Sequence, residues 1–406
     1  MCNESNEKGE LTMEASQKIK VMLIVPMLDQ GGLERVCALT AQLLKTKYEV
    51  HLVVFNTEGM IYDVSGVHLI DLHLGAVPGK IGKAVNVYKR VRQVKKLKKK
   101  LGIQISYSFG QTANMVNVLS KYHDKTWAGI RGYGALDDHR QMQFVCKRAD
   151  RMVSCTKIME QEIEMTYPVK SSATLYNPCN LEEISILSQK DIDDKIAEFL
   201  GRSGPTIVSM GRSHDVKGFW HLIKAVRLVQ DKVPDVKLMI IGDGDYSEYQ
   251  ELAQKLKIEE RVLFTGVQKN PFALLVRADV YALTSDSEGF PNALIEAMAV
   301  GLPCVSVNCK TGPAEILQAD YRKCEAQDKV YHADYGILTP VFHGAKNLDA
   351  DIITQEEKIF AKELTELLSD QKLMEQYKDK AKYRAGQFGL DSYVEAIDKL
   401  IVQELT

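Results

Sequence analysis

The chain has 406 residues, of which 45% are hydrophobic and 26% charged, and its formal net charge is -2. This length suits two domains that each bury a full core. The composition is typical of an ordinary soluble globular protein, and the charge argues against a nucleic-acid binder. The eight cysteines form no Cys-x-x-Cys pair and no Cys/His cluster, so we expect reduced packing residues in a cytoplasmic protein.

The two stretches that could be targeting or membrane segments do not have the required pattern. Residues 1–18 are polar and lack the apolar run of a signal peptide, so they predict a disordered extension. Residues 292–309 are poor in charge, but Glu296, Gly301 and Pro303 interrupt them. A helix, a turn and a buried strand are therefore expected there, and no transmembrane segment is predicted.

Strand and helix patterns alternate from residue 19 onward. A predicted strand at 19–25 and a helix from about Leu33 to Leu44 flank a loop that contains Gly31 and Gly32. Further apolar runs, which read as buried strands, lie at 50–55, 67–72, 103–108, 125–130, 151–155 and 173–176. This alternation predicts an α/β fold with a parallel sheet covered by helices on both faces. The loop lacks the Gly-x-Gly-x-x-Gly fingerprint, which disfavours an NAD-dependent oxidoreductase.

The same pattern begins again at residue 205. Predicted strands lie at 205–210, 237–241, 261–264, 280–284 and 303–307. A polar segment around 180–202, with a predicted helix at 192–200, separates the halves. We therefore predict an N-terminal domain at 19–185, a C-terminal domain at 186–387 and an amphipathic terminal helix within 388–406. Two such doubly wound halves would face each other across a cleft at the carboxyl ends of their strands.

Two carboxylates lie eight residues apart around a predicted helix start. Glu288 precedes a helix expected from about Pro291 to about Val300, and Glu296 lies in its second turn. A helix N-terminus offers unpaired N–H groups to an anion, and a carboxylate can accept two hydrogen bonds from a vicinal diol. A ligand with a diphosphate, a ribose and a sugar needs both.

This spacing, with Gly-Phe-Pro after Glu288 and Gly-x-Pro after the helix, resembles the Glu-x7-Glu motif of retaining glycosyltransferases of family 4. Those enzymes have the GT-B fold of two Rossmann-like domains that face each other across a cleft. The Gly31-Gly32 loop and the terminal helix extend the resemblance over nearly the whole chain. It implies that a hexose or N-acetylhexosamine moves from a nucleotide-diphospho-sugar, expected to be a UDP-sugar, to a growing lipid-linked or polysaccharide glycan. It also implies front-face attack with retention, and a terminal helix that crosses back to the first domain.

The resemblance also implies roles for individual residues. Arg212 and Lys217 would bind the diphosphate and stabilise the charge that builds on it. Glu288 would lie beside the donor sugar and act with these two cations in catalysis, while Glu296 would hold the ribose. The remaining donor contacts are expected at Gly31, Gly32, Gly211, Gly289, Phe290 and Asn292. The donor is a co-substrate, so no cofactor is expected, and the Asp243-Gly244-Asp245 sequence is interpreted as a turn and not as a metal site.

Arg131 marks a departure from the family pattern. Many members carry a His after the corresponding first-domain strand, near the donor sugar and the acceptor. Arginine stays protonated and cannot act as a general base near neutrality. We therefore expect Arg131 to bind a phosphate, either of the donor or of a lipid-diphosphate acceptor.

A densely basic run covers residues 89–100. Apolar residues on one stripe predict a helix that docks on a sheet and turns a basic face outward. Such a face can contact an anionic membrane surface, although a solvated helix face has the same pattern. We interpret it as a peripheral contact at the cytoplasmic face of the membrane.

Several alternatives share parts of this pattern. A GT-B UDP-sugar epimerase would release a changed sugar nucleotide without an acceptor, and a soluble synthase would use a free acceptor. A non-catalytic sugar-nucleotide-binding protein would show no turnover. Two close carboxylates also fit a retaining glycosidase, but Glu296 is expected to be occupied by ribose.

Overall fold

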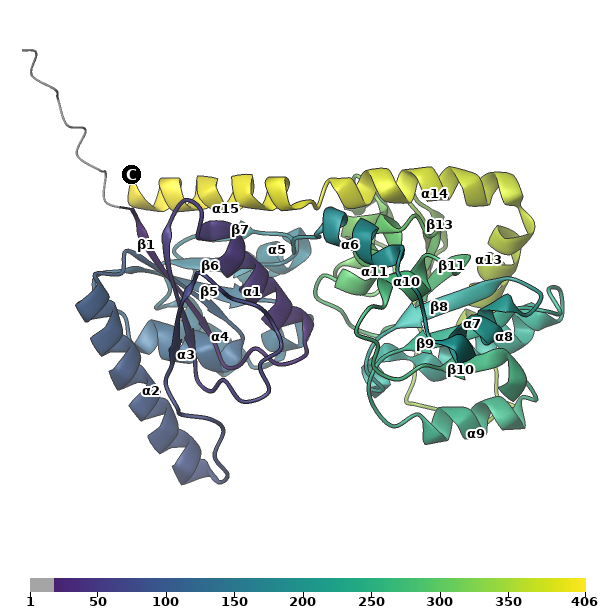
Figure 1. Cartoon of the computed structure of the whole chain (residues 1–406), viewed down its shortest axis with the longest axis horizontal. Helices are drawn as coiled ribbons and strands as arrows, with labels where there is room; N and C mark the ends of the chain where they lie inside the picture. Colours follow the sequence, from purple (N-terminus) through teal and green to yellow (C-terminus); the bar gives the residue numbers. More distant parts are fainter. Residues whose placement is uncertain (1–17) are drawn as a thin grey trace, which may run out of the picture.

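The computed structural model describes residues 18–406, which form two α/β domains side by side (Figure 1). The predicted extension at residues 1–18 lies, except for Lys18, outside the described residues. The first domain holds a seven-stranded sheet in the order β3-β2-β1-β4-β5-β6-β7, and the second holds one in the order β10-β9-β8-β11-β12-β14-β13. Neighbouring strands are parallel except β13 and β14, which pair antiparallel. The predicted pair of doubly wound sheets is therefore present.

The strands lie within two residues of the predicted ranges at either end. The first sheet contains β1 (Lys20–Val25), β2 (Glu49–Val54), β3 (His68–Asp71), β4 (Ile105–Phe109), β5 (Lys125–Ile130), β6 (Arg151–Ser154) and β7 (Ser172–Thr174). The second contains β8 (Thr206–Met210), β9 (Lys237–Ile241), β10 (Val262–Phe264), β11 (Val280–Leu283), β12 (Cys304–Val307), β13 (Tyr331–His332) and β14 (Ile337–Thr339). The sequence analysis missed the short strands β13 and β14.

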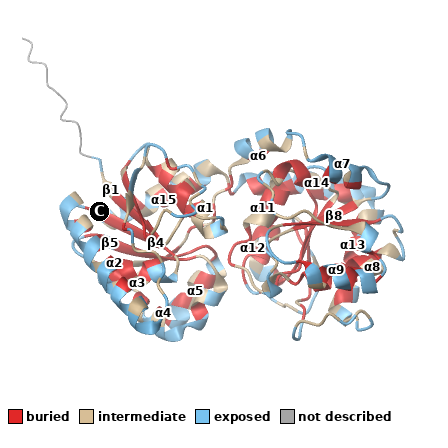
Figure 2. Cartoon of the chain, turned by 60° about the horizontal axis from the view of Figure 1, so that its bottom comes forward, coloured by how far each residue is buried: buried red, intermediate tan, exposed pale blue. Residues whose placement is uncertain are grey.

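Helices cover both faces of each sheet. The first domain carries α1 (Gly32–Leu44), α2 (Lys80–Leu101), α3 (Gln111–Leu119), α4 (His139–Cys146) and α5 (Lys157–Thr166). The rest are α6 (Leu181–Ser188), α7 (Asp194–Gly201), α8 (Phe219–Gln230), α9 (Ser247–Lys255), α10 (Phe272–Leu275), α11 (Asn292–Ala299), α12 (Pro313–Leu317), α13 (Gln355–Ser369), α14 (Gln371–Gly386) and α15 (Leu390–Leu405). Figure 2 shows buried strands between helices whose outer faces are exposed. Because both faces are covered, central strands such as β1 are apolar on both faces after the first residue, Lys20, and do not alternate.

The chain crosses between the domains twice. After β7 it passes through residues 175–180 to α6, which packs against α10 and α11 of the second domain. The first crossing therefore precedes residue 185, where the sequence placed the boundary. The chain returns between α14 and α15, where Phe388 O accepts a hydrogen bond from Cys179 N at 2.8 Å. Figure 1 shows α14 and α15 running along both domains.

Helix α15 packs on the first domain. Its apolar residues Tyr393, Ile397 and Ile401 are buried in the same cluster as the inward residues of β1 and α1. Polar contacts support this packing, since Tyr393 Oη lies 2.6 Å from Thr40 Oγ1 and Arg151 Nε lies 2.9 Å from a Glu404 oxygen. No helix among residues 18–406 has both the length and the apolar character needed to cross a membrane.

Helix α2 corrects one prediction, because its basic residues do not all face outward. Lys98 is buried, and its Nζ donates to Asp124 Oδ2 at 2.9 Å and to Asn117 Oδ1 at 2.7 Å. Arg90 is also buried and donates to Leu74 O at 2.9 Å. The other basic residues of the run at 89–100 are exposed, so the expected basic outer face excludes only these two positions, where the long side chains reach inward to hydrogen-bond partners.

Candidate active site

The predicted site residues gather where the strand order reverses in each sheet, between β1 and β4 and between β8 and β11. Ligands of open α/β sheets bind in the crevice outside the carboxyl ends of the strands at such switch points. The loops that follow β1, β8 and β11 meet here from both domains and line a cavity of about 670 Å³. All the predicted catalytic and donor-binding residues line it: Gly31, Gly32, Arg131, Gly211, Arg212, Lys217, Glu288, Gly289, Phe290, Asn292 and Glu296.

The loop after β8 presents Lys217 to this cavity. Gly218 follows it with φ +61°, and a Cβ there would lie 2.3 Å from Thr284 O, so this position requires glycine. Thr284 Oγ1 donates to Lys217 O at 2.9 Å and holds the turn against the end of β11. A Cβ at Gly211 would lie 3.2 Å from the Lys217 stem. The two glycines thus let the loop pack closely around Lys217, whose side chain lines the cavity.

Lys217 pairs with the first carboxylate of the motif. Its Nζ lies 2.7 Å from Glu288 Oε1, and the side chains are 24% and 11% exposed. The backbone oxygen of Glu288 accepts a hydrogen bond from Thr311 Oγ1. An ion pair that is still open to solvent can exchange partners when an anionic ligand arrives. Lys217 can therefore turn to a phosphate while Glu288 accepts hydrogen bonds from hydroxyls.

Glu296, the second carboxylate, projects from α11. The helix begins at Asn292, with Pro291 as its N-cap, and Gly301 follows its C-cap with φ +89°, so its bounds match the prediction within one residue. Glu296 is 6% exposed and forms an ion pair with Arg35 of α1. The charge of Glu296 raises the pKa of Arg35 above its ordinary value. The pair joins the two domains across the cleft.

Arg35 is a site residue that the sequence analysis missed. It lies in the first turns of α1, three residues after Gly32, and lines the cavity. The sequence feature that could have indicated a role for Arg35 is its position just after the Gly-Gly loop. The pairing with Glu296 spans 261 residues of chain, however, and no local pattern predicts such a contact.

The Gly-Gly loop approaches the second domain closely. Arg212 Nη2 donates to Gln30 O, and a Cβ on Gly31 would lie 3.3 Å from the same nitrogen and 2.0 Å from Glu34 Oε2. A Cβ on Gly32 would lie 3.3 Å from Asn292 Nδ2. Side chains at these glycines would press on the ends of the Glu34, Arg212 and Asn292 side chains, and their absence leaves the loop backbone accessible.

Arg131 reaches the cavity wall, but its guanidinium is bound by the protein. Nη1 donates to Leu175 O at 3.0 Å and to Asn177 Oδ1 at 2.9 Å, and Nη2 donates to Tyr107 Oη. Only Nε is buried without a partner. Three of the five N–H groups of Arg131 thus have protein partners and Nε is buried, so the phosphate contact that the sequence analysis expected stays a prediction.

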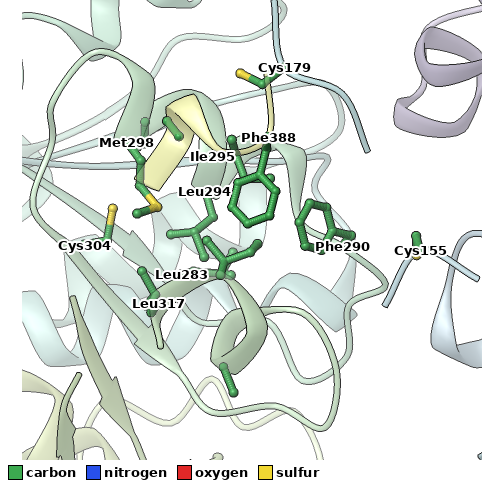
Figure 3. Close-up of a cluster of buried hydrophobic side chains, with 14 of the residues drawn as sticks. Cys155, Cys179, Leu283, Phe290, Leu294, Ile295, Met298, Cys304, Leu317 and Phe388 are labelled. Carbon is green, nitrogen blue, oxygen red and sulfur yellow. The ribbon is translucent and has the colours of Figure 1, made fainter. Parts of the chain in front are cut away.

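Gly289 and Phe290 lie in the loop of residues 288–292, which we call the donor loop after the ligand that the sequence analysis expects there. A Cβ on Gly289 would lie 2.2 Å from Arg131 O, so this glycine allows the domains to touch. The Phe290 side chain is 4% exposed and points into the hydrophobic cluster drawn in Figure 3. Of Phe290, therefore, the backbone and not the ring is available to a ligand.

Asp243 and Asp245 stabilise their own turn. Asp243 Oδ1 accepts from Gly244 N at 2.8 Å, and Asp245 Oδ1 accepts from Ser247 N at 2.9 Å. Gly244 has φ +123° and packs on Ser213 of the loop after β8. Within residues 18–406, His, Cys, Asp and Glu form no group of three or more that could hold a metal ion.

Comparison with known proteins gives a family for part of the chain. Residues 191–328 match the family described as glycosyl transferases group 1. An uncharacterized glycosyltransferase of Methanocaldococcus jannaschii is 31% identical over 265 residues, which span 64% of this chain and 65% of that protein. The N-acetylgalactosamine-N,N'-diacetylbacillosaminyl-diphospho-undecaprenol 4-alpha-N-acetylgalactosaminyltransferase of Campylobacter jejuni is 26% identical, with 91% of this chain and 95% of that protein covered.

The fold is that of the GT-B proteins. The crystal structure of an Anabaena protein, HepE, in complex with UDP and glucose superimposes with a TM-score of 0.71 at 17% identity. The match covers 95% of this chain and all of that one. Both domains and their arrangement are therefore shared.

Proposed function

We propose that this chain, whose residues 191–328 match the group 1 glycosyl transferases, is a retaining glycosyltransferase. It moves a hexose or N-acetylhexosamine from a UDP-sugar to a growing lipid-linked or polysaccharide glycan. One observation carries the proposal: two cations and two carboxylates, Arg212, Lys217, Glu288 and Glu296, line one cleft at the strand ends of a GT-B fold. A diphosphate, a ribose and a sugar require this combination of groups.

The proposed reaction uses these groups in sequence. The anomeric C–O bond to the diphosphate breaks through an oxocarbenium-like state, and the acceptor oxygen bonds to the same face of the sugar. The departing phosphate oxygen takes the acceptor's proton. Lys217 and Arg212 stabilise the negative charge that builds on the diphosphate. Lys217 leaves Glu288 to do so, which frees that carboxylate for the hydroxyls of the sugar.

In this scheme the ribose must compete with Arg35 for Glu296. A ribose that hydrogen-bonds Glu296 meets Arg35, which already pairs with Oε1. Donor binding therefore displaces Arg35 or uses the second carboxylate oxygen. If Arg35 stays, residues of both domains surround the ribose, and if it is displaced, donor binding removes an ion pair between the domains.

The donor proposal is tested by thermal shift with UDP-, GDP- and ADP-sugars. UDP-sugars are expected to bind best, which is consistent with the UDP-bound GT-B structure that resembles this chain. A ligand at a hundredfold excess over its dissociation constant adds about 2.7 kcal/mol of stability. Glu296→Ala should lose most of the shift, whereas Glu251→Ala on the exposed face of α9 should keep it. A larger shift with GDP-sugars would overturn the UDP assignment.

Product analysis separates the proposed transfer from its alternatives. Proton NMR of the product should show the anomeric configuration of the donor sugar, because attack occurs on the face that the diphosphate leaves. An inverted product would exclude retention. A changed sugar nucleotide released without an acceptor would indicate an epimerase, and absence of any turnover would indicate a binding protein.

Helix α2 supports a membrane-linked acceptor. Ile81, Val85 and Tyr88 lie on one face near its start and are 83%, 47% and 64% exposed. The helix contains no acidic residue. Its exposed basic residues are Lys80, Lys83, Lys89, Arg92, Lys95, Lys96, Lys99 and Lys100. Exposed apolar residues beside a basic face suit the interface of an anionic bilayer, and the relative from Campylobacter is named for a diphospho-undecaprenol substrate.

Sedimentation with anionic liposomes tests this surface. Replacing Lys95, Lys96, Lys99 and Lys100 by Gln should reduce binding, since each basic residue near the membrane contributes about 1 kcal/mol. Lys98 is left unchanged because it is buried. Ile81→Ser with Tyr88→Ser should reduce binding at high salt too, where charge attraction is screened. Full binding by both folded variants would show that α2 faces solvent.

A further inference from the structure

The donor loop is packed directly against both points where the chain crosses between the domains. The Phe290 ring stacks on Tyr176 of the first crossing, with centroids 5.0 Å apart. It also meets Phe388 of the second crossing edge-on at 5.2 Å, and Figure 3 shows the two phenylalanine rings side by side. Any rotation of the domains about these crossings therefore acts on the loop.

Asn177, in the first crossing, forms the polar part of this contact. Its side chain is buried, with 6% of the residue exposed. Nδ2 donates to Phe290 O at 3.2 Å and to Asn292 Oδ1 at 2.8 Å. Oδ1 accepts from Arg131 Nη1 at 2.9 Å. One amide thus connects the first domain, the crossing and the donor loop, and uses both its donors and its acceptor to do so.

The bond to Asn292 determines what that residue shows to a ligand. Because Asn292 Oδ1 faces Asn177, its NH2 group must face the opposite way, and Nδ2 lies beside Gly32 on the other wall of the cavity. Asn292 lies one helical turn before Glu296, about 6 Å toward the start of α11. A ribose at Glu296 therefore puts the β-phosphate and the sugar beside an N–H donor.

We propose that Asn177 is the positioning residue of the donor loop. It orients the Asn292 amide with its NH2 toward the donor's β-phosphate and sugar, and it ties the loop to Arg131. The inference rests on the proposed function, because it assumes a nucleotide-sugar donor. It also gives Arg131 a role: its guanidinium holds Asn177 in place.

The replacement Asn177→Asp removes the two donated hydrogen bonds with almost no change in shape. A carboxylate still accepts from Arg131, but it faces Phe290 O and Asn292 Oδ1 without a proton to donate. The Asn292 amide then turns its NH2 to the new carboxylate and its oxygen to the cavity. Asn180→Asp is the matched control, because both side-chain bonds of Asn180 go to Glu183 of α6 and it does not line the cavity. Its oxygen accepts from Glu183 N at 3.2 Å, a cap that Asp can keep, and its Nδ2 donates to Glu183 Oε2 at 3.1 Å, a bond that Asp loses without touching the donor loop.

Calorimetry with UMP and with the UDP-sugar that binds best to the wild type gives the discriminating readout. UMP lacks the β-phosphate and the sugar. In Asn177→Asp the affinity for the UDP-sugar should fall about tenfold or more, the value of one hydrogen bond to a charged group, while that for UMP stays within about threefold. Asn292→Asp should give the same split, because it also replaces the NH2 group by an oxygen. Asn180→Asp should match the wild type with both ligands.

Hydrogen exchange of the donor-loop amides tests the link without any ligand. Exchange at the amides of Gly289, Phe290 and Asn292 should rise in Asn177→Asp and stay unchanged in Asn292→Asp and Asn180→Asp, with melting temperatures recorded for each. Asn177→Asp that matches the wild type in exchange and in both affinities would overturn the inference. A wild type that binds neither nucleotide would instead remove the proposed function, and the exchange result would still decide whether Asn177 holds the loop.

Discussion

The cations on the second domain's wall of the cleft differ from two cations of the first domain in how many protein partners they have. In the second domain Lys217 has one carboxylate partner and is 24% exposed, and Arg212 is exposed at the end of its loop. In the first domain Lys98 is fully buried among four hydrogen-bond acceptors, and Arg131 is bound at both of its Nη atoms. Exposed groups with few partners can turn to a ligand, whereas buried groups with several partners hold the fold.

This difference predicts that substitutions have opposite consequences in the two domains. Removing a charge from the second-domain wall of the cleft should impair donor binding or turnover and leave stability nearly intact. Removing Lys98 from the interior of the first domain should reduce stability and leave the donor site intact. The predictions below test this from the largest expected effect to the smallest.

Lys98→Met should produce the largest loss of stability. It leaves the Asp124 carboxylate buried without its cation, and breaking a buried ion pair costs about 3–5 kcal/mol. Lys99→Met, one residue along on the exposed face, should change stability by less than about 0.5 kcal/mol. Urea unfolding followed by Trp127 fluorescence in a Trp220→Phe background reports the first domain, since the chain has two tryptophans. Equal stability of the two variants would contradict the structural role of Lys98.

Lys217→Ala should have the largest effect on turnover. Removing one preorganised donor from a developing charge costs about 2.7–4 kcal/mol of barrier, or about 10² to 10³ in kcat. The melting temperature should change little, because the Lys217 side chain is partly exposed and its loop is held by backbone contacts. Lys232→Ala, on the surface after α8, is the control. A normal kcat in Lys217→Ala would remove this lysine from the reaction.

The residues of the second domain that the sequence analysis grouped do line one cavity, because their grouping depends on local patterns. Gly211, Lys217, Glu288 and Glu296 lie in strand–loop–helix units whose strands and glycines fix where the loops must be. The first domain's part depends on distant contacts. Arg131 was expected to bind a phosphate, but its partners Leu175 and Asn177 follow more than forty residues later, and nothing near position 131 indicates them.

Lys98 shows a second limit of sequence reasoning. It follows Leu97 on α2 and lies four residues after the buried Val94, so its position on the inward stripe was visible. Lysine is nearly always exposed unless it is paired, however, and the pairing residue Asp124 comes from beyond β4 and α3. The short strand β14 was missed for a related reason, since three residues are too few to show a period.

Glu296→Ala should weaken UDP binding by about 1.5–3 kcal/mol, the usual value of hydrogen bonds to a charged group. Arg35→Gln discriminates better between the possible roles of this ion pair. It leaves Glu296 in place and removes the cation that now pairs with it, so UDP affinity should be retained or increased. Calorimetry with UDP measures both. A loss of UDP affinity in Arg35→Gln would mean that Arg35 itself binds the nucleotide and that the first domain contributes a charge to the donor site.

Asp150→Asn should have the smallest effect, and it should depend on pH. Burial acts to raise the pKa of Asp150, but hydrogen bonds from Lys121 and Thr126 outweigh it, so the pKa lies below its ordinary value. A depressed carboxyl pKa contributes stability above the unfolded pKa of about 3.9, and this contribution is lost as the pH falls through the folded pKa. The free energy of unfolding of the wild type should exceed that of Asp150→Asn by about 1 kcal/mol at pH 7, as expected of a partly exposed pair.

Urea unfolding at a series of pH values should show this difference shrinking below about pH 4. Asp379→Asn on the exposed face of α14 should show no such trend, and a difference that persisted at low pH would mean that Asp150 acts through packing and not through its charge.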